Sequence, residues 1–369
     1  MKILLIGNYL PDHQQSMQRY AALLLSEFAA VGHDVKLLCP PVVLGRYRWP
    51  SSLMKWVGYI DKFVLFPHSL RRAAAWADVV HICDHSNAMY HRHILAKPHV
   101  VTCHDLLAVR SARGDYPLNP VGWSGKILQK WIAGSLQTAK FVVCDSMATL
   151  KDCRQVLGMA SEKLQLVHLG LNYPYRPLPT EHVTALWQQR GLVMDRPYLL
   201  HVGSNSWYKN RSTIIDIFSK LAQQRDIDLV FAGTDLTAVM NQMVADKGLT
   251  SRVKQLGSVT NEELAALYSG AAGLIFPSLI EGYGWPVLEA QACGCPVFTS
   301  NRAPMTEIGG DAAVYFDPLQ PVQAAATIHR HLDDTTDMRA RGFINSAGFT
   351  NTAMRDGYLA IYSRLVHHS

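Results

Sequence analysis

The feature that most constrains the fold is an alternation of short apolar runs with longer amphipathic segments, and it occurs in both halves of the chain. Near-continuous apolar runs separated by helices are typical of parallel strands that are covered on both faces. In the first half, strands are expected at Lys2–Asn8, Asp34–Cys39, Val79–Cys83, Val100–Cys103, Phe141–Cys144 and Leu164–His168, with a helix at Ser16–Val31. In the second half, they are expected at Tyr198–Gly203, Asp228–Gly233, Val253–Leu256, Gly273–Phe276, Pro296–Thr299 and Ala313–Phe316. The sequence therefore predicts an α/β chain of two doubly wound, Rossmann-like domains.

The boundary between the two series is marked by Pro174, Pro177 and Pro179, since each proline fixes its φ angle and lacks an amide donor. The chain has 369 residues, more than the roughly 250–300 that one core usually holds. We expect a first domain at 1–177 and a second at 178–350, with a helix in 351–369 completing the first. Ligands bind beyond the carboxyl ends of the strands in such sheets, so the expected site is a central cleft between facing domains.

Composition narrows the class of protein. With 49% hydrophobic and 17% charged residues the chain is in the globular range. It contains no apolar run near the ~20 residues of a membrane helix, and Met1–Gly7 is too short for a signal peptide, so we expect a cytoplasmic protein. The seven cysteines are expected to be structural, because most end apolar runs and none has zinc-site spacing.

Positive charge is concentrated in the first half: residues 1–177 carry 20 Lys and Arg against 11 Asp and Glu, and the remainder carries 15 against 18. Within this half, residues 46–72 interleave basic residues with aromatic ones. The basic residues are Arg46, Arg48, Lys55, Lys62, Arg71 and Arg72, and the aromatic ones are Tyr47, Trp49, Trp56, Tyr59, Phe63 and Phe66. This pattern suits contact with an anionic membrane surface, an acceptor groove, or a helix that simply packs on the first domain. No recognisable reading element for nucleic acid accompanies the charge, so no nucleic-acid partner is expected.

The strongest local motif spans residues 277–290, where Glu281 and Glu289 are separated by seven residues. It begins at the end of a buried strand, passes a glycine-rich turn and enters a helix near Pro286, as a proline in the first turn allows. Free amides at a helix start suit an oxygen-rich anion, and two carboxylates can accept hydrogen bonds from hydroxyls. On physical grounds alone, two glutamates stabilised by the local dipole explain the motif equally well.

The motif, together with its neighbours, resembles the retaining glycosyltransferases of family 4, which have the GT-B fold. Matching segments occur in order along nearly the whole chain: Met1–Asn8, Gly32–Val35, Thr102–Leu106, Asp145-Ser146, Val202–Ser204, Gly257–Val259 and Asn301–Pro318. The resemblance implies that Glu281 contacts donor-sugar hydroxyls and that Glu289 binds the ribose. It also implies that Lys209 neutralises the donor diphosphate. Further donor contacts are implied at Gly203, Ser204, Asn210, Val259 and at the turn Gly282-Tyr283-Gly284.

Two positions depart from the family pattern. Many relatives carry Arg where this chain has Ser204, so one phosphate cation is missing unless Arg211 or a basic residue of the first half replaces it. The loop after the first strand has Gln15-Ser16 in place of a Gly-Gly pair, which hinders close approach of backbone to phosphate.

On the first-half side, the resemblance implies that His104 contacts the donor sugar. His104 and Asp105 follow the expected strand Val100–Cys103, and Asp105 is interpreted as a helix N-cap. Asp12 and His13 are candidates for an acceptor-side base, or ordinary solvated loop residues.

These implications together predict a hexosyltransferase that moves sugar from a UDP- or GDP-sugar to a glycan, lipid-linked or small-molecule acceptor in polysaccharide or lipopolysaccharide synthesis. Retention by front-face attack is implied by the resemblance. No metal or other cofactor is expected, because no Asp-x-Asp motif stands at a strand end. The alternatives are a sugar-nucleotide epimerase of the same fold and a degenerate carbohydrate-binding protein. A nicotinamide oxidoreductase is disfavoured, because no Gly-x-Gly-x-x-Gly follows a strand.

Overall fold

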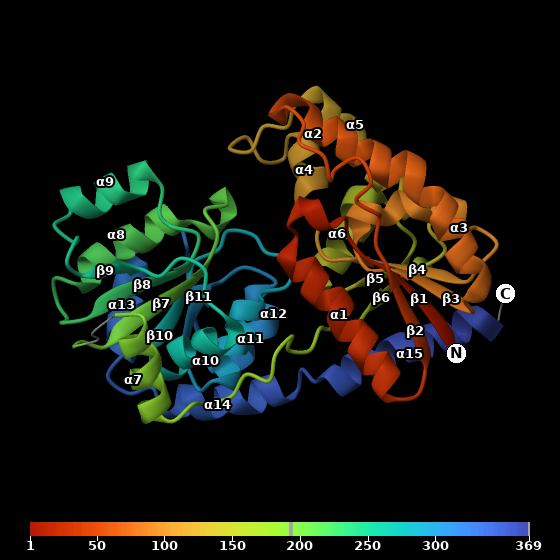
Figure 1. The fold of residues 1–369 in the computed structure, drawn as a ribbon. Helices are drawn as coiled ribbons and strands as arrows, with labels where there is room; N and C mark the ends of the chain where they lie inside the picture. The colour runs from red at the N-terminus through yellow and green to blue at the C-terminus, as the bar shows by residue number, and fades with distance from the viewer. Residues whose placement is uncertain (192–194, 368–369) are drawn as a thin grey trace. The chain divides into compact units, whose positions relative to one another are not determined.

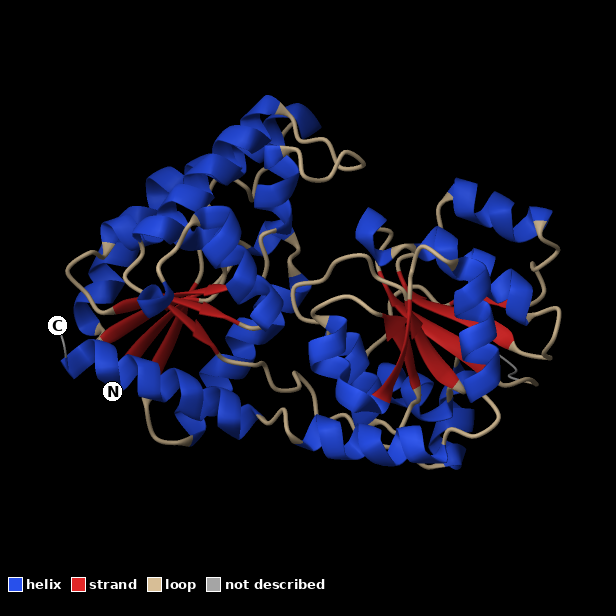
Figure 2. Cartoon of the chain, turned by 180° about the vertical axis from the view of Figure 1, so that it is seen from behind, coloured by secondary structure: helices blue, strands red, loops and turns tan. Residues whose placement is uncertain are grey.

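The computed structural model describes residues 1–191 and 195–367 and divides into two compact units. Unit 1 comprises Met1–Asn172 and Asn351–Ser369, and unit 2 comprises Tyr173–Thr350. The first boundary lies at Asn172 rather than at 177, because Tyr175 packs edge-on against Tyr268 of unit 2 with ring centroids 6.1 Å apart. Each unit contains a six-stranded parallel sheet with helices on both faces (Figures 1 and 2).

The sheet of unit 1 has the order β2-β1-β3-β4-β5-β6. Its strands are β1 Lys2–Ile6, β2 Asp34–Leu38, β3 Val79–Ile82, β4 His99–Cys103, β5 Val142–Cys144 and β6 Leu164–Leu166. Its helices are α1 Gln15–Ala30, α2 Ser51–Ile60, α3 Phe66–Trp76, α4 Leu107–Arg113, α5 Trp123–Thr138, α6 Met147–Leu157 and α15 Asn351–His367. Shorter helical segments are η1 Leu10–Asp12, the π-helical η2 Asp61–Leu65, η3 His85–His93 and η4 Ser161–Lys163. The inner strands β3 and β4 are fully buried, as their continuous apolar runs predict, whereas the edge strand β2 is partly exposed.

The sheet of unit 2 has the order β12-β11-β10-β7-β8-β9. Its strands are β7 Tyr198–Gly203, β8 Asp228–Gly233, β9 Val253–Gln255, β10 Gly273–Phe276, β11 Val297–Ser300 and β12 Ala313–Phe316. Its helices are α7 Thr180–Gln189, α8 Arg211–Leu221, α9 Ala238–Asp246, α10 Asn261–Gly270, α11 Trp285–Ala292, α12 Met305–Gly309, α13 Pro321–His331 and α14 Thr336–Ala347, with short turns η5 Trp207–Lys209 and η6 Gly310–Ala312. All twelve strands expected from the sequence are present, and the predicted two-sheet α/β fold is confirmed.

The C-terminal helix α15 belongs to unit 1, where a buried polar network ties it to the sheet. His81 of β3 hydrogen-bonds through Nδ1 to the Tyr362 hydroxyl at 2.6 Å and through Nε2 to Thr102 Oγ1 at 2.7 Å. Thr102 Oγ1 also lies 2.9 Å from the Tyr358 hydroxyl, which accepts a hydrogen bond from Tyr20 of α1. Buried hydroxyls need such partners, so the network fixes where α15 docks.

Candidate active site

The candidate site of unit 2 lies where the strand order reverses. β7 and β10 are neighbours, and the chain continues from β7 toward β9 on one side and from β10 toward β12 on the other. Loops after two such strands diverge and leave a crevice at the carboxyl edge of the sheet, where doubly wound domains bind ligands. The segment 204–211 follows β7 and the segment 277–284 follows β10. Both of the motifs that the sequence analysis singled out in the second half therefore start at this crevice.

An ion pair joins the two loops. Lys209 Nζ lies 2.7 Å from Glu281 Oε1, although the residues are 72 positions apart. The Lys209 and Glu281 side chains are only 13% and 10% exposed, so water screens the pair weakly. The main chain reinforces the junction, because Leu279 N donates to Tyr208 O at 2.7 Å. The structure thus brings together the predicted phosphate cation and the predicted sugar carboxylate.

The helix that carries the second glutamate begins directly after a left-handed glycine. Gly284 has φ of 107°, a conformation that disfavours a side chain, and α11 starts at Trp285 with Pro286 in its first turn. Glu289 lies on α11, where it is 5% exposed and accepts a hydrogen bond from the Tyr268 hydroxyl at 2.9 Å. Burial raises the pKa of Tyr268 well above its usual value, so this residue remains a hydrogen-bond donor. The position of the Glu289 carboxylate is therefore fixed by a buried phenol that the sequence analysis did not identify.

Asn210 holds three loops of the crevice together. Its Nδ2 donates to Pro277 O at 3.3 Å and to Pro318 O at 3.1 Å, and its Oδ1 accepts from Thr213 Oγ1 at 2.7 Å. Both amide hydrogens are thus used within unit 2. This geometry makes Asn210 a residue that positions the loops after β7, β10 and β12, whereas the sequence analysis expected a direct donor contact.

The residues near the missing arginine do not supply an accessible replacement. Ser204 Oγ hydrogen-bonds to Ser206 Oγ at 2.9 Å. Arg211 is 1% exposed, and its Nη1 donates to Asn205 Oδ1 and to Thr234 O, each at 2.6 Å. Burial lowers the pKa of Arg211 to about 10. The guanidinium of Arg211 is thus enclosed within unit 2, and its replacement of the missing phosphate cation stays a prediction.

Gly203 lies directly beside the lysine side chain. A Cβ atom placed there would meet His201 Nε2 at 3.4 Å and Lys209 Cδ at 3.5 Å, which are ordinary contact distances. The neighbouring strand end is tighter, since a Cβ at Gly233 would lie 2.2 Å from Gly203 O. The ends of β7 and β8 thus approach each other closely at the carboxyl edge.

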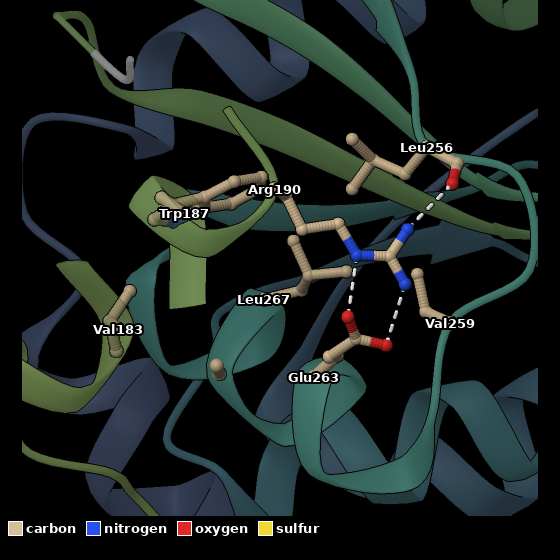
Figure 3. Close-up of a pocket in the computed structure, with 8 residues that line it drawn as sticks. Val183, Trp187, Arg190, Leu256, Val259, Glu263 and Leu267 are labelled. Carbon is tan, nitrogen blue, oxygen red and sulfur yellow. Dashed lines mark hydrogen bonds and ion pairs between the residues drawn. The ribbon is translucent and has the colours of Figure 1, made fainter. Parts of the chain in front are cut away.

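The loop after β9 is clamped on both sides of Val259 (Figure 3). Arg190 donates through Nη1 to Leu256 O at 3.1 Å and through Nη2 to Ser258 O at 3.2 Å, and it pairs with the Glu263 carboxylate. Glu263 also accepts from Thr260 N at 2.7 Å in a capping box at the start of α10. Gly257 O accepts from Gly233 N at 2.8 Å, which attaches this loop to the carboxyl edge of the sheet. Arg190 is thus a second residue that the sequence analysis did not identify.

The first-half candidate His104 is enclosed by unit 1. Its Nδ1 lies 2.9 Å from Asp145 Oδ2, and its Nε2 lies 2.9 Å from Cys83 O. Burial opposes protonation, but the hydrogen bond and charge of Asp145 outweigh it and raise the pKa of His104 to about 9. Both nitrogens are therefore donors at neutral pH, and neither is left for a sugar hydroxyl. Asp145 directly follows β5, and His104 directly follows the neighbouring strand β4. This shared position at the ends of neighbouring strands is the one feature of the sequence that could have indicated their pairing.

The loop after β1 places the remaining candidates at the start of α1. Asp12 pairs with Lys62 at 2.8 Å, which occupies the carboxylate that was a candidate base. His13 is exposed with φ of 51°, and Gln15 and Ser16 are exposed in the first turn of α1. The structure therefore places these residues at the start of a helix. The free backbone amides of a helix start can bind an anion, so the backbone here is better suited to that role than the side chains are.

The acidic residue next to His104 lies at the start of helix α4. The N-cap of α4 is Leu106 and not Asp105 as predicted, although Asp105 Oδ1 accepts a hydrogen bond from Leu107 N at 2.8 Å just before the helix. Within residues 1–191 and 195–367, no group of three or more His, Cys, Asp and Glu side chains could hold a metal ion. Over the same residues, no helix is long and apolar enough to cross a membrane.

The fold and the site together define a class of protein: two doubly wound domains, one of which has a cation, a carboxylate and a glycine-rich helix start at its switch point. The model of the "Glycosyltransferase Family 4" matches residues 17–173, and that of "Glycosyl transferases group 1" matches residues 184–347. The two matches cover most of the chain without overlap. The chain belongs to the group 1 glycosyltransferases of family 4, as the resemblance predicted.

Curated relatives agree with this assignment. The chain is 27% identical over 273 residues to O-antigen chain mannosyltransferase B of Escherichia coli, covering 71% of this chain and 69% of that protein. It is 26% identical over 226 residues to the MMP alpha-(1->4)-mannosyltransferase of Mycolicibacterium hassiacum, covering 60% of this chain and 51% of that one, about half its length.

Solved structures agree on the fold. Sucrose-phosphate synthase from Thermosynechococcus elongatus superimposes with a TM-score of 0.77 at 19% identity over 100% of both chains. HepE of Anabaena in complex with UDP-glucose superimposes with a TM-score of 0.75 at 16% identity over 99% of this chain and 100% of that one. The GT-B fold is thereby established, and the matches as a whole support a glycosyltransferase that uses a nucleotide sugar. They do not favour the epimerase or the degenerate binding protein.

Proposed function

We propose that the protein transfers a hexosyl residue from a nucleotide-diphosphate sugar to a glycan or lipid-linked acceptor, with retention of configuration and without a metal ion. The Lys209–Glu281 pair at the switch point of unit 2 carries this proposal. A mannosyl donor and an O-antigen-type glycan are the first candidates, because two relatives are mannosyltransferases and one of them acts on the O-antigen chain. The HepE structure with UDP-glucose supports a nucleoside diphosphate as the leaving group.

We assign complementary roles to the two residues of the pair. An ammonium group has three N–H donors, and Glu281 Oε1 takes one of those of Lys209, so two remain for diphosphate oxygens. The second oxygen of Glu281, Oε2, has no partner among the described residues and is available to a sugar hydroxyl. As the glycosidic bond breaks, negative charge gathers on the diphosphate, and a fixed cation stabilises that charge more than it stabilises the bound donor.

The nucleoside half of the donor is assigned to the other two elements at the same edge. We assign the ribose to Glu289, whose carboxylate is oriented by Tyr268. We assign the base to the main chain of Val259, which forms no hydrogen bond within the described residues. Amides at the start of α11, in the turn 282–284, complete the contacts to sugar and phosphate oxygens.

Retention is proposed without a protein nucleophile. The sequence predicts no carboxylate as a nucleophile; in the structure both nitrogens of His104 are hydrogen-bonded, and Oδ2 of Asp12 is ion-paired with Lys62. In front-face attack, the acceptor hydroxyl approaches from the side of the departing phosphate and gives its proton to a phosphate oxygen. We therefore assign His104 a positioning role, in which its ion pair with Asp145 fixes the ends of β4 and β5.

Donor binding and transfer test the proposal separately. Nucleotide sugars are first screened for a rise in melting temperature, and UDP- and GDP-hexoses should raise it by mass action. For the donor that binds, Glu289→Gln should lower affinity about 10- to 100-fold, corresponding to the loss of a hydrogen bond to a charged group. Glu181→Gln, which alters an exposed residue of α7, is the matched control. An unchanged affinity in Glu289→Gln would place the ribose elsewhere.

The metal-free reaction is tested with the lysine. Lys209→Met should lower turnover about 100- to 1000-fold, the usual effect of removing a positioned donor to a developing anion. Transfer by the wild type should persist in excess chelator, and the anomeric configuration of the product is read by NMR. A reaction that chelator abolishes, and that Lys209→Met leaves nearly intact, would show that a metal stabilises the leaving group.

A further inference from the structure

Exposed large apolar side chains gather in two segments of unit 1. Among the described residues, 21 large hydrophobic side chains are exposed, and 11 of them fall within residues 47–65 and 118–127. They are Tyr47, Trp49, Leu53, Met54, Trp56, Ile60, Val64, Leu65, Leu118, Trp123 and Ile127. Trp56 is 50% exposed and Trp123 is 73% exposed, and with Trp49 these are all the exposed tryptophans of the described residues. A soluble surface scatters such residues singly, so their clustering indicates an interaction site.

The two segments form one surface. Lys55 of α2 donates to Ser124 Oγ of α5 at 3.3 Å, and the rings of Phe63 and Trp131 lie 5.1 Å apart. Figure 1 shows α2 and α5 alongside each other in unit 1. We call residues 46–65 together with 117–130 the α2–α5 surface. The structure thus excludes the possibility that residues 46–72 only pack on the first domain, because three of their six aromatic side chains are exposed and two more are partly exposed.

The charge of this surface has one sign. Its exposed charged side chains are all basic: Arg46, Arg48, Lys55, Lys126 and Lys130. Its only acidic residue, Asp61, is buried and accepts hydrogen bonds from the Tyr9 hydroxyl and from the amides of Leu44 and Gly45. Burial raises the pKa of Asp61, but the hydrogen bonds from these groups outweigh burial and lower the pKa below its usual value. The Asp61 carboxylate is therefore charged and hydrogen-bonded inside unit 1. Nothing acidic on the surface offsets the five cations.

We propose that the α2–α5 surface docks this enzyme on an anionic lipid bilayer. Tryptophan and tyrosine favour the membrane–water interface, and lysine and arginine beside them are attracted to anionic headgroups. Helix α2 continues through η2 into α3, and no helix of the described residues is long and apolar enough to cross a bilayer, so we place α2 along the membrane surface. A protein partner is a weaker match, because lysine is depleted in protein interfaces. This inference deepens the proposed function, since it supplies the partner that would present a lipid-linked acceptor.

Sedimentation of the full chain with vesicles tests the inference without using catalysis. Vesicles of phosphatidylglycerol and phosphatidylcholine in a 3:7 ratio should bind the protein, and binding should fall as salt rises. Pure phosphatidylcholine vesicles should bind it at least tenfold less. The double variant Trp56→Asp, Trp123→Asp should lose most of the binding, and Lys126→Glu with Lys130→Glu should lose at least tenfold, since each cation contributes about fivefold.

A matched control uses exposed apolar residues elsewhere. Val239→Asp with Ile344→Asp alters side chains of unit 2 that are 71% and 76% exposed, and vesicle binding should be unchanged. Circular dichroism and the melting temperature check that each variant is folded. Equal binding by all variants, or equal binding to both vesicle types, would overturn the inference. Donor-induced stabilisation is measured on the same preparations, so a failure of the docking surface can be told from a failure of the proposed transferase.

If none of the vesicles binds while the tryptophan variant still loses transfer to a water-soluble acceptor, the surface is an acceptor groove and the membrane inference is wrong. If the tryptophan variant changes neither vesicle binding nor transfer, the surface serves another partner, and the inference is equally refuted.

Discussion

Breaking the Lys209–Glu281 pair should destabilise unit 2 more than an ordinary surface ion pair would. Removing one member of a buried pair typically costs about 3–5 kcal/mol, because the other charge is left in a poorly solvated place. The Lys209 and Glu281 side chains keep 13% and 10% exposure, so partial hydration reduces our expected loss for Lys209→Met or Glu281→Gln to about 2–3 kcal/mol. At about 2–4 °C per kcal/mol for a unit of this size, the melting temperature should fall by about 5–10 °C.

The double variant gives the sharper result. Lys209→Met with Glu281→Gln leaves no unpaired charge, so its stability should return to within about 1 kcal/mol of the wild type. Calorimetry of the wild type, both single variants and the double variant completes the cycle. Lys247 and Asp216 provide the control, because this pair of the same unit is 2.9 Å apart but 32% and 39% exposed. Lys247→Met should cost at most about 1 kcal/mol. Additive losses in the Lys209–Glu281 cycle would refute the coupling on which the site is built.

Two other predictions concern groups that position the site. His104 in the unfolded chain loses its proton near pH 6.5, whereas in the folded chain its pKa is about 9, so its stabilisation is complete below pH 6.5 and is lost as the pH rises to about 9. Urea unfolding should show a loss of about 3 kcal/mol over this range, and His104→Gln should lack that slope. Arg190→Ala should raise the donor KM about tenfold through the loop of Val259 while leaving kcat nearly unchanged. Arg225→Ala removes a similar clamp elsewhere and should change neither constant.

The strands could be predicted because parallel strands buried on both faces must be apolar throughout. The strongest examples are the inner strands β7, β8 and β10, whose observed ends coincide with those expected. The C-terminal helix was also readable from its apolar spacing, and α15 is present over Asn351–His367. The domain boundary was predicted less accurately, at 177 instead of Asn172. Prolines mark where the backbone turns, but they do not indicate which hydrophobic core the neighbouring Tyr175 joins.

In the candidate active site, too, some residues could be predicted from the sequence and others could not. Glu281, Glu289 and Lys209 could be proposed from motifs, because a glycine-rich turn before a helix is a local feature of sequence. Tyr268 and Arg190 could not, because their hydrogen bonds to Glu289 and to the loop of Val259 join residues 21 or more positions apart. Nothing near either residue in the sequence indicates its partner.

The sequence by itself determined the two α/β series, the family and the residues able to carry charge at strand ends. Only the tertiary structure decided what those charges contact. It enclosed Arg211 and His104, whose sequence positions equally allowed a ligand contact, and it left Trp56 and Trp123 in solvent, although tryptophans are as often packed. The physical reason is that burial and pairing depend on which elements meet across the sheet, and hydrophobic periodicity fixes the face of an element but not its neighbour.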